Sequence, residues 1–155
     1  MEKNLEINVL YVDDEENNLI AFKAAFRRYF SVFTALSAEE AQKILVENTI
    51  HVLITDQRMP GTLGTELLAK AVQDYPEQIR ILLTGYSDIE ALKDAVNRGQ
   101  IFRYLQKPWN DEELKKTIED SFKVYAIKKE QNEKNEKLVL TNEQLEFMLR
   151  QKLLS

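Results

Sequence analysis

The stretch Ile7-Asn8-Val9-Leu10-Tyr11-Val12-Asp13-Asp14 decides the fold, because an apolar run with several β-branched residues stops abruptly at two acidic residues. Four more short apolar runs follow along the chain, at residues 31–36, 51–55, 79–84 and 101–106. Runs that are apolar throughout, rather than alternating, are typical of strands in a parallel sheet covered on both faces. The chain is therefore expected to contain five parallel strands.

The segments between these runs carry apolar residues at intervals of three and four, which is the spacing of helices. Ser37 and Glu40 have the spacing of a capping box at the start of the second such segment. The other helices are expected from about Leu19 to Tyr29, over 65–74, from Ser87 to Gly99, and from Asn110 or Asp111 onward. Five strands alternating with five helices through right-handed crossovers predict an α/β fold with a doubly wound five-stranded parallel sheet.

The composition excludes several kinds of site. The 155 residues include 21 Lys and Arg, 26 Asp and Glu, one histidine (His51) and no cysteine, and the formal net charge is −5. Disulfides, zinc–thiolate centres, cysteine nucleophiles and multi-histidine metal sites are therefore excluded. No apolar run is long enough to cross a membrane and the N-terminus lacks the layout of a signal peptide, so we expect a cytoplasmic protein without membrane contact. The acidic balance argues against direct nucleic acid binding by this chain.

Charged and polar residues stand where the predicted strands end. Asp13 and Asp14 follow the first strand, Asp56 follows the third, Thr84 ends the fourth and Lys107 follows the fifth. The carboxyl ends of parallel strands form the working edge of such sheets, so these side chains should converge. Three neighbouring carboxylates repel one another unless a cation neutralises them, and oxygen ligands of this kind suit Mg²⁺. A carboxylate can also form an aspartyl phosphate, and Mg²⁺, an ammonium and a hydroxyl would stabilise the charge of that transfer.

These motifs give residues 5–125 a specific resemblance to the receiver domain of two-component response regulators. They read Val12-Asp13-Asp14-Glu15, Asp56-Gln57-Arg58-Met59-Pro60-Gly61, Thr84-Gly85-Tyr86 and Lys107-Pro108-Trp109. The sequences of these motifs resemble those of receivers fused to cyclic-dinucleotide phosphodiesterases or to hydrogenase-type transcription regulators. The resemblance implies the flavodoxin-like strand order 2-1-3-4-5, with an extended C-terminal helix.

The resemblance also implies how the acidic residues work. Asp56 would be the phosphoacceptor that takes a phosphoryl group from a partner histidine kinase or phosphotransfer protein. Asp13 and Asp14 would hold Mg²⁺ together with Asp56 and the backbone carbonyl of Arg58. Each of these aspartates, taken alone, could simply cap the helix that follows it, but capping does not require three of them to converge.

Three further residues would follow the phosphoryl group by the same resemblance. Thr84 and Lys107 would each contact a phosphoryl oxygen. Tyr104, three residues before Lys107, matches the aromatic that turns inward when Thr84 moves toward that group. The plainer interpretations are an ordinary strand threonine, a surface lysine and a packed strand aromatic.

The other residues considered are expected to tune the phosphorylation chemistry or to pack in the core. Arg58 and Tyr86 should flank the phosphoryl group, and we hypothesise that they restrict the attacking water and lengthen the phosphorylated lifetime. Gly85 should leave the group accessible to its donor. His51 and Trp109 are expected to pack rather than to act.

The favoured function is a phosphorylation-controlled switch that is not an enzyme beyond catalysing its own phosphorylation and dephosphorylation. An aspartate-based phosphatase remains an alternative, although Arg58 stands where such phosphatases commonly carry a second carboxylate. A binding module that works without phosphorylation is the other alternative, although that class usually lacks the acceptor aspartate or Lys107, and both are present.

The expected organisation is a receiver domain over residues 1–125 and a helical linker, able to form a coiled coil, over 126–155. Residues 128–137 contain no apolar side chain and should be solvated or frayed. Beyond them, Leu138, Leu145 and Lys152 lie seven apart, with Asn142 and Leu149 between them, which resembles a short heptad seam. A parallel homodimer through this helix is favoured over a partly ordered linker. No output domain fits in this segment, so the chain is either a fragment of a longer regulator or a stand-alone receiver.

Overall fold

The computed structural model describes residues 6–85, 89–98 and 101–154, and within them five strands alternate with five helices. The strands are β1 (Asn8–Val12), β2 (Ser31–Ala35), β3 (Val52–Asp56), β4 (Ile79–Thr84) and β5 (Arg103–Gln106). The helices are α1 (Glu16–Phe26), α2 (Ala38–Glu47), α3 (Gly64–Asp74), α4 (Ile89–Asn97) and α5 (Asp111–Leu154).

The strands form one parallel sheet in the order β2-β1-β3-β4-β5, which confirms the predicted doubly wound α/β fold. The register aligns the strand ends that carry the polar residues. Val12 pairs with Thr55, and Asp56 pairs with Leu83. Asp13, Asp56 and Thr84 therefore emerge at the same edge of the sheet.

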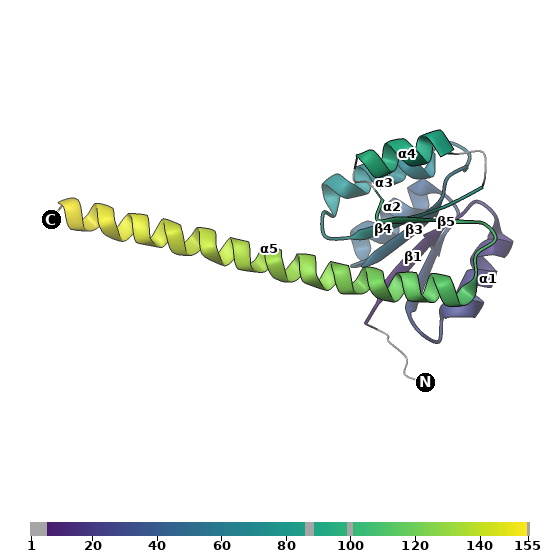
Figure 1. Cartoon of the computed structure of the whole chain (residues 1–155), viewed down its shortest axis with the longest axis horizontal. Coiled ribbons are helices and arrows are strands. Elements are labelled where there is room, and N and C mark those ends of the chain that lie inside the picture. The colour runs from purple at the N-terminus through teal and green to yellow at the C-terminus, as the bar shows by residue number, and fades with distance from the viewer. Residues whose placement is uncertain (1–5, 86–88, 99–100, 155) are drawn as a thin grey trace.

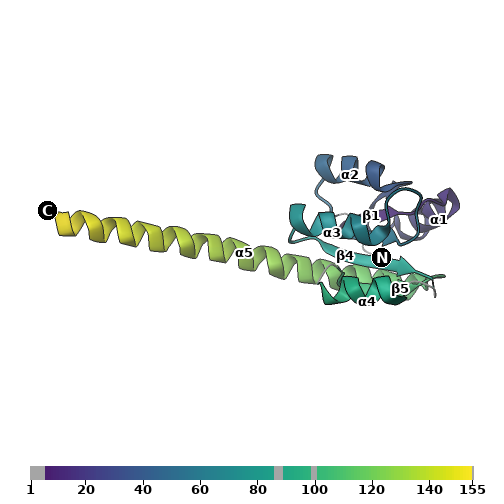
Figure 2. The ribbon, with the colours of Figure 1, turned by 90° about the horizontal axis from the view of Figure 1, so that it is seen from above.

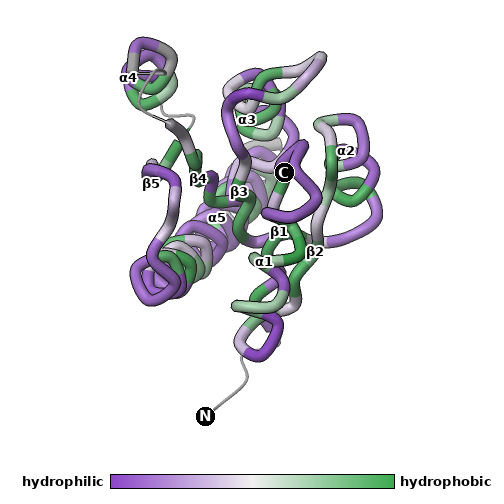
Figure 3. The backbone as a smooth tube through the Cα atoms, turned by 90° about the vertical axis from the view of Figure 1, so that its right-hand side faces the viewer, coloured by the Kyte–Doolittle hydropathy of each residue, from purple (hydrophilic) through white to green (hydrophobic). Residues whose placement is uncertain are grey.

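The two faces of the sheet carry separate apolar cores, as expected for strands that are apolar on both sides. Leu10 and Val12 of β1 point toward the layer formed by α2, α3 and α4. Val9 and Tyr11 point to the other face, where α1 and α5 pack. Figure 3, seen roughly along α5, shows the single sheet between these two layers of helices.

The helix starts follow the predicted capping chemistry, except that the Glu40 carboxylate accepts from the nitrogen of Leu36 rather than from that of Ser37. Ser37 Oγ accepts a hydrogen bond from the Glu40 backbone nitrogen at 3.2 Å, while the Glu40 carboxylate accepts from the Leu36 nitrogen at 2.8 Å. Asn110 caps α5, because its Oδ1 accepts from the Glu113 nitrogen at 3.0 Å. The expected cap at Ser87 and the expected end at Gly99 lie outside the described residues.

Two elements have other bounds than the sequence predicts. The first helix was expected from about Leu19 to Tyr29 but begins at Glu16 and ends at Phe26, after which turns fold Phe30 back onto the core at 2% exposure. The fifth strand begins at Arg103 rather than at Ile101. The apolar pattern extends past the end of α1 and before the start of β5, because residues in turns that pack on the core are apolar too.

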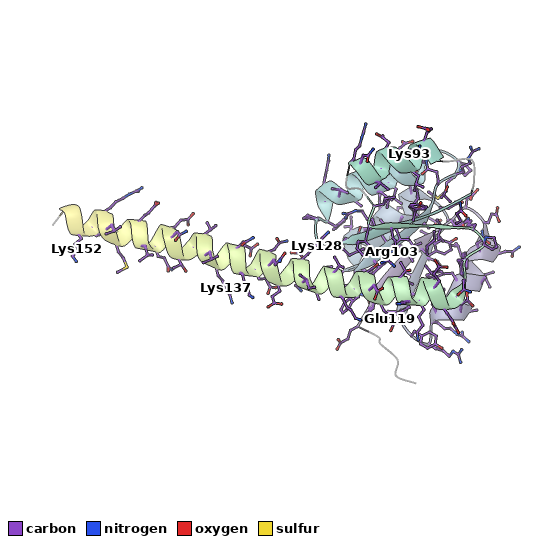
Figure 4. All side chains as sticks on the ribbon, viewed as in Figure 1. Lys93, Arg103, Glu119, Lys128, Lys137 and Lys152 are labelled. Atoms are coloured by element: carbon purple, nitrogen blue, oxygen red, sulfur yellow. The ribbon has the colours of Figure 1, made fainter. Side chains whose placement is uncertain are left out.

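Helix α5 runs for 44 residues and extends far beyond the sheet, as Figure 2 shows. Near the point where the helix leaves the domain, Asn132 Nδ2 donates a 3.1 Å hydrogen bond to Glu77 Oε1. Residues 128–137 are helical rather than frayed, and most of their side chains are exposed. Lys137 and Lys152 mark this projecting part in Figure 4. Among the described residues, no helix has the length and apolar character needed to span a membrane.

Candidate functional site

The three acidic residues that the sequence places at strand ends lie together in the structure. One carboxylate oxygen from each of Asp13, Asp14 and Asp56 lies within 4.8 Å of the others. The Asp13 side chain is fully buried and that of Asp56 is 14% exposed, while Asp14 is exposed. The cluster is thus open to solvent on the Asp14 side, and its all-oxygen donors suit a hard divalent cation.

Lys107 bridges two of these carboxylates. Its Nζ lies 2.7 Å from Asp13 Oδ2 and 3.1 Å from Asp56 Oδ2, and the Lys107 side chain is 24% exposed. The residue follows β5, and its peptide bond to Pro108 is cis. A charge-assisted contact to both carboxylates holds the ammonium between Asp13 and Asp56.

The charges of this cluster shift one another's pKa values. Burial raises the pKa of Asp56, and the attraction of Lys107 offsets this only in part. Burial would also raise the pKa of Asp13, but hydrogen bonds from Lys107, Tyr11 and the Glu15 nitrogen outweigh it and lower the pKa. Burial likewise acts to lower the pKa of Lys107, but Asp13 and Asp56 reverse that effect and raise it. Lys107 and Asp13 therefore form a charged pair at neutral pH.

Tyr11 is a further member of the site, which its place within an apolar strand does not reveal. Its hydroxyl donates to Asp13 Oδ2 from the apolar core, and Asn18 Nδ2 donates to the same oxygen at 3.1 Å. Burial, followed by the hydrogen bond to Asp13, raises the pKa of Tyr11. The available signal was the spacing, because residues two apart on a strand point to the same face.

The loop after Asp56 is packed closely against the start of α3. Gln57 clamps this junction: its Oε1 accepts from the Thr65 nitrogen at 2.9 Å, and its backbone carbonyl accepts from the Gly64 nitrogen at 2.9 Å. A Cβ at Gly64 would lie 2.2 Å from the Asp56 carbonyl oxygen, so only glycine allows this approach. The backbone of Asp56 is therefore held from behind by Gly64 and Gln57.

The remaining residues predicted for the site surround this centre at different exposures. Thr84 is 3% exposed at the end of β4, and its hydroxyl donates to the Gly85 carbonyl at 3.1 Å. Tyr104 on β5 is 48% exposed and so lies toward solvent. Arg58 and Gly85 are exposed, and a Cβ at Gly85 would meet no atom within 4 Å. Tyr86 lies outside the described residues.

His51 and Trp109 pack as the sequence predicts. His51 Nδ1 accepts a 2.9 Å hydrogen bond from the Asn8 nitrogen, and its ring contacts Phe122 edge-on at a centroid distance of 5.1 Å. Trp109 meets Tyr11 edge-on at 5.7 Å, and its Nε1 donates to Asp111 Oδ1 at 2.9 Å. The contact between His51 and Phe122 ties the start of β3 to α5. The contact between Trp109 and Tyr11 ties the site to the start of α5.

This arrangement combines a partly buried carboxylate, an ammonium beside it and two further carboxylates that can hold a divalent cation. It can accept a phosphoryl group on Asp56 and neutralise the charge of that transfer. The sequence model described as "Response regulator receiver domain" matches residues 9–119. The chain belongs to the response regulator receiver domain family. As a receiver domain it is a signalling domain that accepts a phosphoryl group on an aspartate, and neither the phosphatase nor the phosphorylation-independent alternative is favoured.

Known relatives of this receiver domain include hydrogenase-type transcription regulators, the class that its motifs resemble. It is 30% identical over 127 residues to the hydrogenase transcriptional regulatory protein HoxA of Bradyrhizobium diazoefficiens, covering 82% of this chain and 26% of that protein. The chain thus spans about a quarter of the length of the curated relatives it matches.

Solved structures agree on the fold. A structure described as adenylate cyclase from Rhodopirellula baltica is 34% identical with a TM-score of 0.79, and the match covers 81% of this chain and 94% of that one. A response regulator receiver domain protein from Clostridium thermocellum is 31% identical with a TM-score of 0.74, covering 78% of this chain and 98% of that one.

Proposed function

We propose that Asp56 is the phosphoacceptor of this receiver domain and that a histidine kinase or phosphotransfer protein is its donor. The observation that carries the assignment is Lys107, whose Nζ lies 3.1 Å from Asp56 Oδ2. An Asp56 carboxylate oxygen attacks phosphorus, a new O–P bond forms, and the P–N bond to the donor histidine breaks. The imidazole leaves with the electron pair of that bond, and Lys107 faces the charge on the transferred group.

Asp13, Asp14 and Asp56, with the backbone carbonyl of Arg58, are the groups we propose to hold Mg²⁺. Their donor set fits this ion, since one oxygen of each carboxylate lies within 4.8 Å of the others and Asp14 is open to solvent. When bound, Mg²⁺ would neutralise negative charge on the phosphoryl oxygens. The chain's own residues orient the acceptor: Gly64 and Gln57 fix the Asp56 backbone, and Lys107 fixes its carboxylate.

Thr84 and Tyr104 are the groups we assign to the conformational response. The phosphoryl group would attract the Thr84 hydroxyl away from the Gly85 carbonyl, to which it is bonded at 3.1 Å. That movement would open space beneath Tyr104, whose side chain is 48% exposed and therefore free to gain contacts by turning inward. The surface formed by α4, β5 and α5 would change, and α5 would carry the change into the projecting helix.

The lifetime of the phosphorylated state is assigned to residues at the rim of the site. Arg58 is exposed two residues after Asp56, and we propose that Arg58 and Tyr86 restrict the attacking water. Gly85 leaves the approach open, because a Cβ there would meet nothing within 4 Å. Faster loss of the phosphoryl group from Arg58→Ala than from wild type is expected, and an unchanged or slower loss would reject this role.

The domain acts as a switch rather than as an enzyme on other substrates, catalysing only its own phosphorylation and dephosphorylation in the cytoplasm. Its output would be an effector outside this chain, since the HoxA relative is a transcriptional regulatory protein of which the match covers only 26%. We propose that the projecting part of α5 forms a parallel homodimer that passes the change on. Leu138, Leu145 and Leu149, on the proposed seam, are 61%, 52% and 61% exposed in the single chain.

Intact-mass measurement tests the assignment. The protein is incubated with Mg²⁺ and acetyl phosphate, and wild type is expected to gain the mass of one phosphoryl group. Asp56→Asn should gain none, while Asp74→Asn, a matched change at an exposed aspartate at the end of α3, should behave as wild type. Mass gain that survives Asp56→Asn would contradict the assignment.

A further inference from the structure

The phenol of Tyr11 has no role in the transfer chemistry above, yet it is fully buried against the site. Its hydroxyl donates to Asp13 Oδ2, and its exposure is 0%. The ring is fixed on two sides, with its centroid 4.6 Å from that of Phe22 and 5.7 Å from that of Trp109. A hydroxyl held in this way donates from one fixed position on β1.

Asp13 Oδ2 accepts two other hydrogen bonds. Lys107 Nζ donates at 2.7 Å and Asn18 Nδ2 at 3.1 Å. Of the three donors only Lys107 is charged, and Lys107 is also shared with Asp56 Oδ2 at 3.1 Å. Asp13 therefore shares its charged partner with the carboxylate that we propose is phosphorylated.

Phosphorylation of Asp56 would change this sharing. A phosphoryl group brings about 1.5 to 2 negative charges and three acceptor oxygens beside Lys107. The ammonium will turn its N–H groups toward them, and Asp13 Oδ2 then loses its charged hydrogen-bond donor, even where the carboxylate cluster also holds Mg²⁺. The Asp13 side chain is 0% exposed, so protein donors rather than bulk water satisfy its carboxylate in this arrangement. A buried carboxylate that loses a donor is strongly disfavoured unless other donors remain.

We propose that Tyr11 is a positioning residue that keeps the Asp13 carboxylate hydrogen-bonded and in place while Lys107 turns to the phosphoryl group. Tyr11 touches neither the donor nor the phosphoryl group, and it acts through Asp13 alone. Its effect is largest in the phosphorylated state and in the transition state leading to it, because Lys107 supports Asp13 only in the unphosphorylated state. This inference rests on the proposed function, since it takes Asp56 as the acceptor.

The test is Tyr11→Phe, which removes the hydroxyl and keeps the ring contacts. At saturating Mg²⁺ and acetyl phosphate, the rate constant of phosphorylation is expected to fall about ten-fold, as for loss of one hydrogen bond to a charged group. The Mg²⁺ Kd of the unphosphorylated protein, read from the fluorescence of Trp109, the single tryptophan, should change by less than about two-fold. Lys107 and Asn18 still support Asp13 in that state.

Tyr125→Phe is the matched control, because Tyr125 is also buried but packs on His51 at the other end of β3. Asn18→Ala removes the other neutral donor from the surface of α1 and should give a smaller loss in the same direction. A merely structural role of Tyr11 would lower the Tm and leave the rate constant unchanged well below it. That result, or a Kd that weakens as much as the rate falls, overturns the proposal. Failure of wild type to gain phosphoryl mass would instead contradict the proposed function itself.

Discussion

Gly64→Ala should destabilise the receiver domain and slow its phosphorylation, because a side chain at this position has no room. A Cβ at Gly64 would lie 2.2 Å from the Asp56 carbonyl oxygen, 3.0 Å from the Asp56 carbonyl carbon and 3.1 Å from the Gln57 Cα. Carbon and oxygen ordinarily approach to about 3.5 Å, so the backbone would have to move by about 1 Å. All three are backbone atoms, which cannot turn away as the end of a flexible side chain can.

The size of the effect follows from two opposing contributions. Overpacking of this kind costs about 1–3 kcal/mol. Alanine also restricts the unfolded chain, which offsets about 0.4–1 kcal/mol of that cost. The free energy of unfolding should therefore fall by about 1–2 kcal/mol, and the Tm by about 2–8 °C. A displacement of about 1 Å of the Asp56 backbone would also move the carboxylate relative to Lys107 and could slow phosphorylation up to about a hundred-fold.

Urea unfolding followed by circular dichroism and intact-mass phosphorylation kinetics measure the two effects. Gly85→Ala is the matched control for stability, because a Cβ there would meet nothing within 4 Å, and its unfolding free energy should stay within about 0.5 kcal/mol of wild type. If Gly64→Ala unfolds as wild type does and is phosphorylated at the same rate, the close approach does not position Asp56, and the reasoning is refuted.

Three further predictions concern Lys107, His51 and the projecting helix. Lys107→Met leaves Asp13 and Asp56 facing each other without their shared cation. In urea unfolding without metal, the free energy of unfolding should therefore fall by about 1–3 kcal/mol, and added Mg²⁺ should restore part of this loss. An unchanged stability would contradict the bridging role of Lys107. Burial, and then the charge of Lys129, lowers the pKa of His51 in the folded protein. The stability that the neutral ring contributes is therefore fully present above the unfolded pKa of about 6.5, and it is lost as the pH falls from there through the folded pKa. His51→Gln should therefore show a smaller stability difference between pH 7.5 and 5.5 than wild type, and an equal difference would reject this linkage. Leu145→Lys should turn the proposed dimer into a monomer by light scattering, whereas Gln144→Lys, outside the seam, should not; a wild type that is monomeric with and without phosphodonor removes the dimer.

The fold could be predicted because short apolar runs alternate along the chain with segments of helical spacing. Continuous apolar strands and the spacing between them determined the parallel sheet, and the parallel sheet brought Asp13 and Asp56 to one edge. Boundaries were less accurate at the end of α1, since residues in a packed turn have the same apolar pattern as residues in a helix.

Two contributors to the site could not be identified from the sequence. Tyr11 lies within an apolar strand, where an aromatic residue is ordinary, and only the structure shows its hydroxyl on Asp13. Gly64 allows the Asp56 backbone to pack against α3 because it has no side chain, and this contact joins two separate segments that local spacing does not relate. For Tyr11 the two-residue spacing to Asp13 was available, but the same spacing occurs in any strand and does not by itself indicate a hydrogen bond.

Locating the phosphoryl group on the chain tests the central claim most directly. Borohydride reduces an acyl phosphate to an alcohol, so a phosphorylated aspartate becomes homoserine while the other carboxylates remain unchanged. After incubation with Mg²⁺ and acetyl phosphate, peptide mapping should find homoserine at position 56 and aspartate at positions 13 and 14. Homoserine at position 13 or 14, or at no position in a protein that has gained phosphoryl mass, would contradict the assignment of Asp56 as the phosphoacceptor.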